Sequence, residues 1–145
     1  ETNQLIKKKI ESAINEKLSV IFCIGEALKE KKRGKTFSIL KKQIKSSLEK
    51  KFNVNKIIFA YEPVWSIGTN KIPKMNELKS TIKFIKNEFK KTFKRKKSPK
   101  VLYGGSVNDK NISLFSSISE IDGFLIGGAS QSSKKFIDIV KNYYK

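Results

Sequence analysis

The stretch Ile57-Ile58-Phe59-Ala60-Tyr61 decides the fold predicted for this chain of 145 residues. All five side chains are apolar or aromatic, without the alternation of a strand that has one solvated face. Such a continuous run is typical of a strand in a parallel sheet, covered on both faces. Glu62 follows it directly and Pro63 comes next, so we expect the strand to end there.

Three further segments predict strands. The apolar run of residues 20–24 is as continuous as the first. Residues 101–103 run into the pair Gly104-Gly105, and residues 123–126 run into the pair Gly127-Gly128. Glycine pairs interrupt regular structure, so both strands should end at them.

Apolar residues at helical spacing fill the segments between the strands. Strands that alternate with helices imply right-handed crossovers and a parallel sheet, so the fold class is α/β. The predicted helices cover residues 3–18, 37–48 and 78–93, a short one starts at Asn108 or Asp109 and reaches Phe115, and a last one is capped by Ser130 or Ser132.

Four parallel strands are few for a complete sheet of this kind. The first and last strands are as apolar as the middle ones, although edge strands are normally short, charged or covered. Four strands also cannot close a barrel around a packed core. We therefore interpret residues 1–145 as a single domain that forms half of an eight-stranded barrel.

The charge of the chain does not by itself indicate a nucleic-acid partner. Lys and Arg total 32 against 13 acidic residues, which gives a formal charge of +19. Only Arg33 and Arg95 are arginines, although base readout and paired phosphate contacts favour Arg. We expect lysine on solvated helix faces and no specific nucleic-acid binding. A nucleic-acid binder remains an alternative, testable by retention on DNA at about 0.2 M salt.

Composition excludes several other classes. The chain has no histidine and one cysteine, which excludes a His-based triad, a zinc finger and an internal disulfide. A lone cysteine fits a reducing compartment, and there is no secretory-type start, so we expect a cytoplasmic location. No apolar run approaches the roughly 18 to 20 residues of a membrane span, so we expect no membrane partner.

The residues that suggest chemistry all follow strands, where parallel α/β folds bind ligands. Glu62 could act as a general base, although a polar residue that merely leaves the sheet is the ordinary alternative. The loop Pro63–Thr69 has the composition of a lid. The glycine pairs expose backbone N–H groups near helix starts and suit a phosphate, although most such pairs are only turns.

Four motifs, in order, resemble the triosephosphate isomerase family. Residues 60–65 (Ala-Tyr-Glu-Pro-Val-Trp), with Ile67-Gly68-Thr69, are similar to its catalytic-base and lid signature. Residues 23–26 (Cys-Ile-Gly-Glu) resemble the turn after its fifth strand, and residues 103–107 and 122–130 resemble its seventh- and eighth-strand signatures. The resemblance implies the carboxyl-terminal part of a TIM (β/α)8 barrel, whose complete form has about 250 residues.

The resemblance implies a role for each matching residue. Glu62 would move a proton between adjacent carbons of a triose phosphate through an enediolate, with no cofactor and no metal. Tyr103 and Ser106 would latch the lid, and Cys23 and Glu26 would be structural. The N–H groups expected to bind phosphate belong to Gly68, Ser106, Gly127 and Gly128. The lid would comprise Pro63, Val64, Trp65, Ser66, Ile67, Gly68 and Thr69.

The resemblance also implies what surrounds this chain. It predicts interconversion of glyceraldehyde 3-phosphate and dihydroxyacetone phosphate in glycolysis and gluconeogenesis, and a homodimer for the complete protein. The family's Asn-Lys pair and catalytic His would lie upstream of Glu1, so we expect the chain alone to be inactive. Within the matched region, Ser66 stands where the family usually has Ala, Asn70 where it usually has Gly, and Pro73 in the second lid hinge.

A non-catalytic, phosphate-binding half barrel is the alternative to an isomerase. It would account for a chain without the histidine and the Asn-Lys pair. The sequence immediately upstream of Glu1 would distinguish the two, because an in-frame continuation with a histidine at a strand end favours the enzyme.

Overall fold

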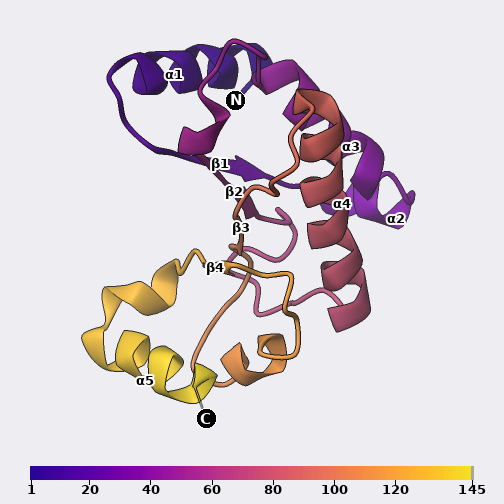
Figure 1. Ribbon diagram of the computed structural model, residues 1–145. Helices are drawn as coiled ribbons and strands as arrows, with labels where there is room; N and C mark the ends of the chain where they lie inside the picture. The colour runs from indigo at the N-terminus through magenta and orange to yellow at the C-terminus, as the bar shows by residue number, and fades with distance from the viewer. Residues whose placement is uncertain (145) are drawn as a thin grey trace.

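The computed structural model describes residues 1–144 and contains one parallel sheet (Figure 1). Its four strands lie in the order in which they occur in the sequence, and each pairs in parallel with the next. The α/β class and the four parallel strands predicted from the sequence are therefore confirmed. The strands are β1 (Val20–Ile24), β2 (Ile57–Tyr61), β3 (Val101–Tyr103) and β4 (Gly123–Phe124).

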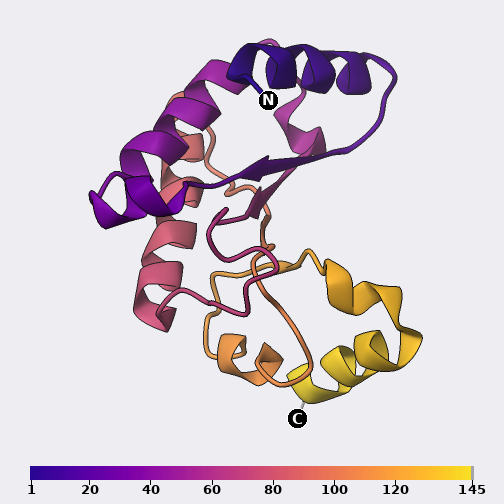
Figure 2. The ribbon, with the colours of Figure 1, turned by 180° about the vertical axis from the view of Figure 1, so that it is seen from behind.

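Helices follow the strands around the outside of a curved, open arc, whose inner side opens between α1 and α5 (Figures 1 and 2). The α-helices are α1 (Asn3–Asn15), α2 (Leu28–Lys32), α3 (Thr36–Ser47), α4 (Met75–Phe93) and α5 (Ser133–Tyr143). Three short 3-10 helices complete the described chain: η1 (Val54–Lys56), η2 (Ile112–Phe115) and η3 (Gly128–Gln131).

Side-chain caps start two of the predicted helices. The Thr2 hydroxyl accepts a hydrogen bond from the Leu5 N–H at the start of α1, and Ser132 accepts one from the Lys135 N–H at the start of α5. Each cap satisfies one N–H that the helix itself leaves without a partner. Of the two capping serines considered for the last helix, the structure selects Ser132.

The sequence predictions differ from the structure at several element ends. Helix α1 stops at Asn15 because the chain turns at Lys17, which has a positive φ of 61°, and Leu18 is then 58% exposed. Strand β4 covers two residues instead of four, since it pairs only with β3. The expected helix over residues 108–115 is reduced to η2, and α2 was not predicted because five polar-rich residues show no helical periodicity.

The core lies between the outer face of the sheet and the helices α3 and α4. Phe59, fully buried on β2, contacts the rings of Phe22 and Phe89 at centroid distances of 5.6 and 5.7 Å. Aromatic pairs in such tilted and edge arrangements stabilise a core beyond the area they bury. The apolar stripe of the third predicted helix thus covers the middle of the sheet.

The inner face of β1 is open, which corrects the expectation that this strand is covered on both faces. Phe22 and Ile24 are buried under the helices, whereas Ile21 is 48% exposed and Cys23 is also exposed. The reason is geometric: within residues 1–144, no strand pairs with the free edge of β1 or faces it from across the arc. Helix packing therefore covers only one of its faces.

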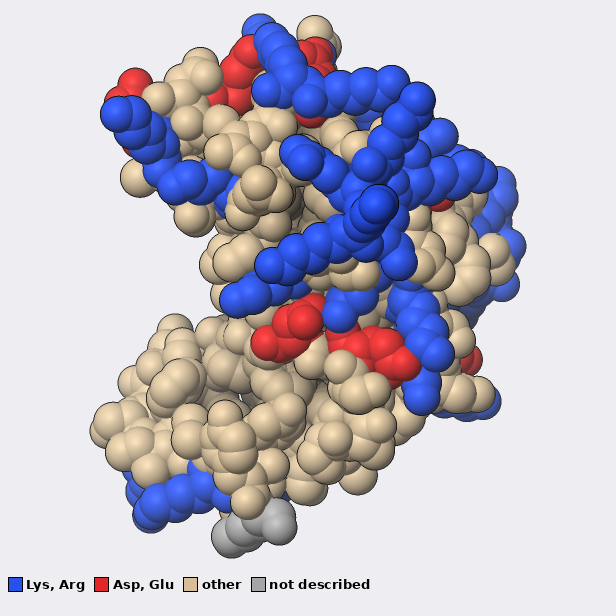
Figure 3. Space-filling model, viewed as in Figure 1, with Lys and Arg blue, Asp and Glu red and all other residues tan. Residues whose placement is uncertain are grey.

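Basic side chains spread over the outer surface rather than forming one groove. Figure 3 shows Lys and Arg over the part of the molecule that carries α1, α3 and α4, with few charges over the part that carries α5. Several lysines pair with acidic residues, such as Lys86 with Asp122 at 2.7 Å. Among the described helices, none is both long and apolar enough to cross a membrane.

Two buried positions on α3 provide a matched test of this packing. Leu40 and Ser47 are both fully buried, and the Ser47 hydroxyl has no hydrogen-bond partner among the described residues. We expect Leu40→Ala to lower the free energy of unfolding by about 2–5 kcal/mol through the cavity it leaves. Ser47→Ala should leave it unchanged or raise it by about 1 kcal/mol, because an unpaired buried hydroxyl is removed.

Urea unfolding, followed through the single tryptophan Trp65, measures both variants. Equal losses of stability in Leu40→Ala and Ser47→Ala would contradict this account of the α3 interface.

Candidate active site

Backbone hydrogen bonds continue past the ends of the strands and fix the residues that follow them. The Glu62 N–H donates to the Ile24 carbonyl at 2.8 Å, and the Gly104 N–H donates to the Tyr61 carbonyl at 2.9 Å. The Leu125 N–H donates to the Tyr103 carbonyl at 3.0 Å. Residues after β2, β3 and β4 are thus held side by side at the carboxyl edge of the sheet, where this class of fold binds ligands.

Glu62 is packed between two glycines. A Cβ atom at Gly25 would lie 1.8 Å from the Glu62 carbonyl oxygen, and one at Gly104 would lie 2.7 Å from the Glu62 Cγ atom. Neither position has room for a side chain, so both glycines are needed for this approach. The Glu62 side chain itself is half-buried. The first glycine pair therefore adjoins the carboxylate that the sequence predicts as a general base.

The Cys23 thiol also adjoins Glu62. Partial burial and then the neighbouring Glu62 carboxylate, through a hydrogen bond and its charge, raise the pKa of Cys23 to about 12. A thiol with so high a pKa stays protonated near neutral pH and is a poor nucleophile. The structural role predicted for Cys23 remains a prediction, and its environment disfavours thiolate chemistry.

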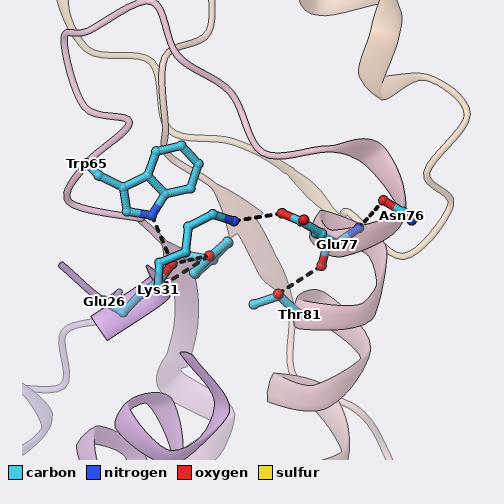
Figure 4. Close-up of polar contacts among 7 residues, drawn as sticks. Glu26, Lys31, Trp65, Asn76, Glu77 and Thr81 are labelled. Carbon is cyan, nitrogen blue, oxygen red and sulfur yellow. Dashed lines mark hydrogen bonds and ion pairs between the residues drawn. The ribbon is translucent and has the colours of Figure 1, made fainter. Parts of the chain in front are cut away.

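A fully buried carboxylate, Glu26, holds the start of the predicted lid (Figure 4). The Trp65 indole Nε1–H donates to Glu26 Oε1 at 2.9 Å, and the Tyr61 hydroxyl donates to Glu26 Oε2 at 3.1 Å. Burial and the charge of Glu26 raise the pKa of Tyr61, so Tyr61 stays a hydrogen donor. Hydrogen bonds to a charged acceptor are among the stronger ones, which makes Glu26 an anchor for both residues.

Lys31 of α2 covers Trp65 from the other side. Its ammonium lies 4.7 Å from the centre of the Trp65 ring and 2.6 Å from Glu77 Oε2, near the start of α4 (Figure 4). A cavity of about 470 Å³ lies between α2, α3 and α4 and is lined in part by Lys31, Tyr61 and Glu77. Neither Glu62 nor the two glycine pairs line this cavity.

The lid residues divide into exposed and buried ones. Val64 and Ile67 are 58% and 49% exposed, whereas Ser66 is fully buried. Gly68 and Asn70 both have positive φ angles, 67° and 59°, a conformation that Gly adopts freely and Asn more readily than most residues. The chain can therefore turn at Asn70, where the family that the motifs resemble usually has Gly.

Tyr103 and Ser106, the predicted latch, both face the lid residue Ser66. The Ser66 and Tyr103 hydroxyl oxygens are 3.3 Å apart, and the Ser106 N–H donates to Ser66 Oγ at 3.3 Å. The contact runs through the side chain of Ser66. The sequence placed this serine in the predicted lid and marked it as a departure from the family pattern, but it did not predict these contacts.

The second glycine pair is open to solvent. Gly127 and Gly128 are exposed, and apart from their chain neighbours no atom of the described residues would lie within 4 Å of a Cβ on either. Their N–H groups donate to no acceptor within residues 1–144. A Cβ on Gly68 would likewise have no atom of the described residues within 4 Å apart from its chain neighbours. Their role in phosphate binding remains a prediction. The described residues contain no cluster of His, Cys, Asp and Glu that could hold a metal ion.

Comparison with known proteins identifies the family. The sequence model for triosephosphate isomerase matches residues 1–143. The chain belongs to the triosephosphate isomerase family. It is 48% identical to the triosephosphate isomerase of Dictyoglomus thermophilum over 98% of its own length, and 39% identical to that of Mycoplasmopsis pulmonis over 97%.

A solved structure supports the same assignment. The crystal structure of triosephosphate isomerase from Bartonella henselae superimposes with a TM-score of 0.87 at 30% identity and covers 99% of this chain. The chain spans 59% of the length of that structure and of the Dictyoglomus relative. The four strands of this triosephosphate isomerase family member are thus part of a TIM barrel, as predicted.

Two features of the site were not predicted from the sequence. The contacts of Lys31 with Trp65 and Glu77 join residues far apart in the chain, and a lysine among 32 basic residues carries no distinguishing signal. The second is the close approach of Gly25 to the Glu62 backbone. A signal for it existed, because Gly25 directly follows an apolar strand, but one glycine there indicates only a turn.

The single thiol provides a direct test of the geometry around Glu62. Replacing Glu62 with Gln removes the negative charge beside Cys23, so the thiol pKa should fall from about 12 towards its ordinary range. At pH 9, Glu62→Gln should therefore react with iodoacetamide several times faster than the unchanged chain.

The pH dependence of alkylation measures the effect, and Glu120→Gln is the matched control, since Glu120 faces Lys79 and Lys83 on the outer surface. Equal alkylation rates for Glu62→Gln and Glu120→Gln would refute the contact between Cys23 and Glu62.

Proposed function

We propose that this chain supplies the base, the lid and the phosphate amides of a triosephosphate isomerase. The reaction is the interconversion of glyceraldehyde 3-phosphate and dihydroxyacetone phosphate. The observation that carries the proposal is the position of Glu62, fixed by its backbone N–H to Ile24 and by close packing with Gly25 and Gly104. A general base must be held within hydrogen-bond reach of the proton it takes, and these contacts leave its backbone little freedom.

In the proposed reaction, the Glu62 carboxylate takes a proton from one carbon of the triose phosphate and returns it to the adjacent carbon. The intermediate is an enediolate. Gly104 directly follows β3, and its lack of a side chain makes room for the Glu62 side chain. The Cys23 thiol, kept protonated by its raised pKa, adds no second negative charge next to the base.

The phosphate of the substrate would bind to backbone N–H groups after β3 and β4. Gly127 and Gly128, at the start of η3, have N–H groups that donate to no acceptor among the described residues, and Ser106 follows the first glycine pair. The Gly68 N–H would join them from the lid. Uncharged amides can hold an anion without placing a cation beside Glu62, which would lower the basicity of the carboxylate.

The lid would close over the bound substrate and exclude water. Its first part is anchored by Trp65 on Glu26, while the exposed Val64 and Ile67 provide an apolar surface that closure can cover. Excluding water strengthens a carboxylate base and protects a reactive intermediate. Pro73, in the second hinge, restricts the backbone and would slow this motion.

The complete activity needs strands that this chain does not contain. Residues 1–144 form an open arc with an uncovered inner face on β1. We propose that the chain is one partial barrel, that amino-terminal strands close it, and that those strands bring the Asn-Lys pair and the histidine of the family. The closed protein would be a cytoplasmic homodimer with a triose phosphate as its substrate. The chain alone would be inactive.

The test is a completed barrel. Joining the amino-terminal strands of the Dictyoglomus thermophilum relative to residues 1–145 should give an active isomerase in a coupled triose phosphate assay. Glu62→Gln should lower kcat about 10²- to 10⁴-fold, the usual contribution of a general base. Glu62→Asp, which withdraws the carboxylate by one methylene, should cost about 10²-fold.

Glu120→Asp is the control and should retain the activity of the completed barrel. Unchanged activity in Glu62→Asp would contradict the assignment of the base. Phosphate binding without isomerase activity in a folded, completed barrel would favour the non-catalytic alternative.

A further inference from the structure

Ser66 lies at the centre of a small polar network that joins the lid to the end of β3. Its hydroxyl donates to the Lys71 carbonyl at 2.5 Å, contacts the Tyr103 hydroxyl at 3.3 Å and accepts from the Ser106 N–H at 3.3 Å. The side chain is fully buried. Lys71 lies just after the lid, Tyr103 is the last residue of β3, and Ser106 lies in the loop that follows β3.

Counting protons fixes the direction of each hydrogen bond. A serine hydroxyl has one proton to donate and two lone pairs with which to accept. The Lys71 carbonyl can only accept, so it takes the Ser66 proton, and the Ser106 N–H can only donate. Tyr103 must then donate to Ser66. Burial raises the pKa of Tyr103 to about 12, so its hydroxyl keeps the proton that this arrangement requires.

Gly105 creates the space for this network. A Cβ atom at that position would lie 2.1 Å from the Tyr103 hydroxyl oxygen and 2.7 Å from Ser66 Oγ. The second residue of the first glycine pair therefore serves the lid contact, while the first residue, Gly104, makes room for Glu62.

The contact between Ser66 and Ser106 is the one most easily exchanged. At 3.3 Å it is longer than the usual range of about 2.7–3.2 Å for such a bond. Ser106 is held separately, because the Asn111 side-chain amide donates to the Ser106 carbonyl at 2.9 Å. The Ser106 N–H can therefore change its acceptor while the residue stays in place.

We propose that the Ser66 hydroxyl is a resident acceptor that occupies the Ser106 N–H until a phosphate group replaces it. The proposal rests on the proposed function, in which this N–H binds the substrate phosphate. Phosphate and Ser66 then compete for one donor. When phosphate replaces Ser66 at this N–H, the lid loses its contact with Ser106 and keeps the one with Tyr103 at the end of β3, which frees the lid to advance over the ligand.

The test compares Ser66→Ala with Ser47→Ala in the full 145-residue chain and in the completed barrel. Both variants replace a fully buried serine with alanine, and neither changes the net charge, so non-specific attraction of phosphate to the many lysines is the same in both. Only Ser66→Ala removes the competing acceptor. Ser47 has no hydrogen-bond partner among the described residues and lies on α3.

Titration with inorganic phosphate at constant ionic strength, followed by the NMR signal of the Ser106 amide, gives the dissociation constant. We expect Ser66→Ala to lower it about three- to tenfold, as loss of one modest competing hydrogen bond would, and Ser47→Ala to leave it unchanged. Without phosphate, the Ser106 N–H should exchange with solvent faster in Ser66→Ala. Tyr103→Phe, which keeps the Ser66–Ser106 contact, should bring no gain in affinity.

Weaker or unchanged phosphate binding in Ser66→Ala would overturn the proposal, as would a Ser106 amide that does not respond to phosphate. The assay of the completed barrel separates this result from the proposed function. If the completed barrel is an active isomerase but Ser66→Ala does not change its phosphate affinity, only the competition is refuted. If Ser66→Ala strengthens phosphate binding but the completed barrel has no isomerase activity, only the enzymatic role is refuted.

Discussion

The parallel hydrogen-bond ladder is the constraint on which the rest of the structure depends. It continues one residue beyond β2 and β3, through the N–H groups of Glu62 and Gly104, and so sets the positions of both before any side-chain contact is considered. In a parallel sheet every strand ends at the same edge. That geometry brings together a carboxylate, a thiol and a glycine pair that lie about 80 residues apart from first to last in the sequence.

The site is tightly packed around Glu62 and open to solvent after β4, at its rim. Around Glu62, three glycines stand where a side chain would collide with another group. A Cβ at Gly25 would meet the Glu62 backbone, one at Gly104 the Glu62 side chain, and one at Gly105 the hydroxyls of Tyr103 and Ser66. At the rim, Gly127 and Gly128 face solvent, and their N–H groups donate to no acceptor among the described residues. The first group of glycines fixes the position of Glu62 and Ser66, and the second leaves the space beside these N–H groups open.

The lid is held by polar contacts of different strength. Trp65 donates a hydrogen bond to the buried Glu26 carboxylate and is covered by Lys31, so the start of the predicted lid is held on two sides. The contacts of Ser66 with Tyr103 and Ser106 are longer and uncharged, so they break more easily. If residues 63–69 act as the proposed lid, these attachments let it move at one end while it remains anchored at the other.

Local patterns along the chain were enough to predict the four parallel strands, the alternating helices, the carboxylate at a strand end and the family, because apolar runs, helical spacing and short motifs each involve neighbouring residues. The packing of the folded chain set the length of β4, the open inner face of β1, the Lys31–Trp65–Glu77 contacts and the network around Ser66. These depend on which distant residues meet. A single serine in place of alanine signals a departure in the sequence, but its partners are set by how β3 and the lid pack together in space.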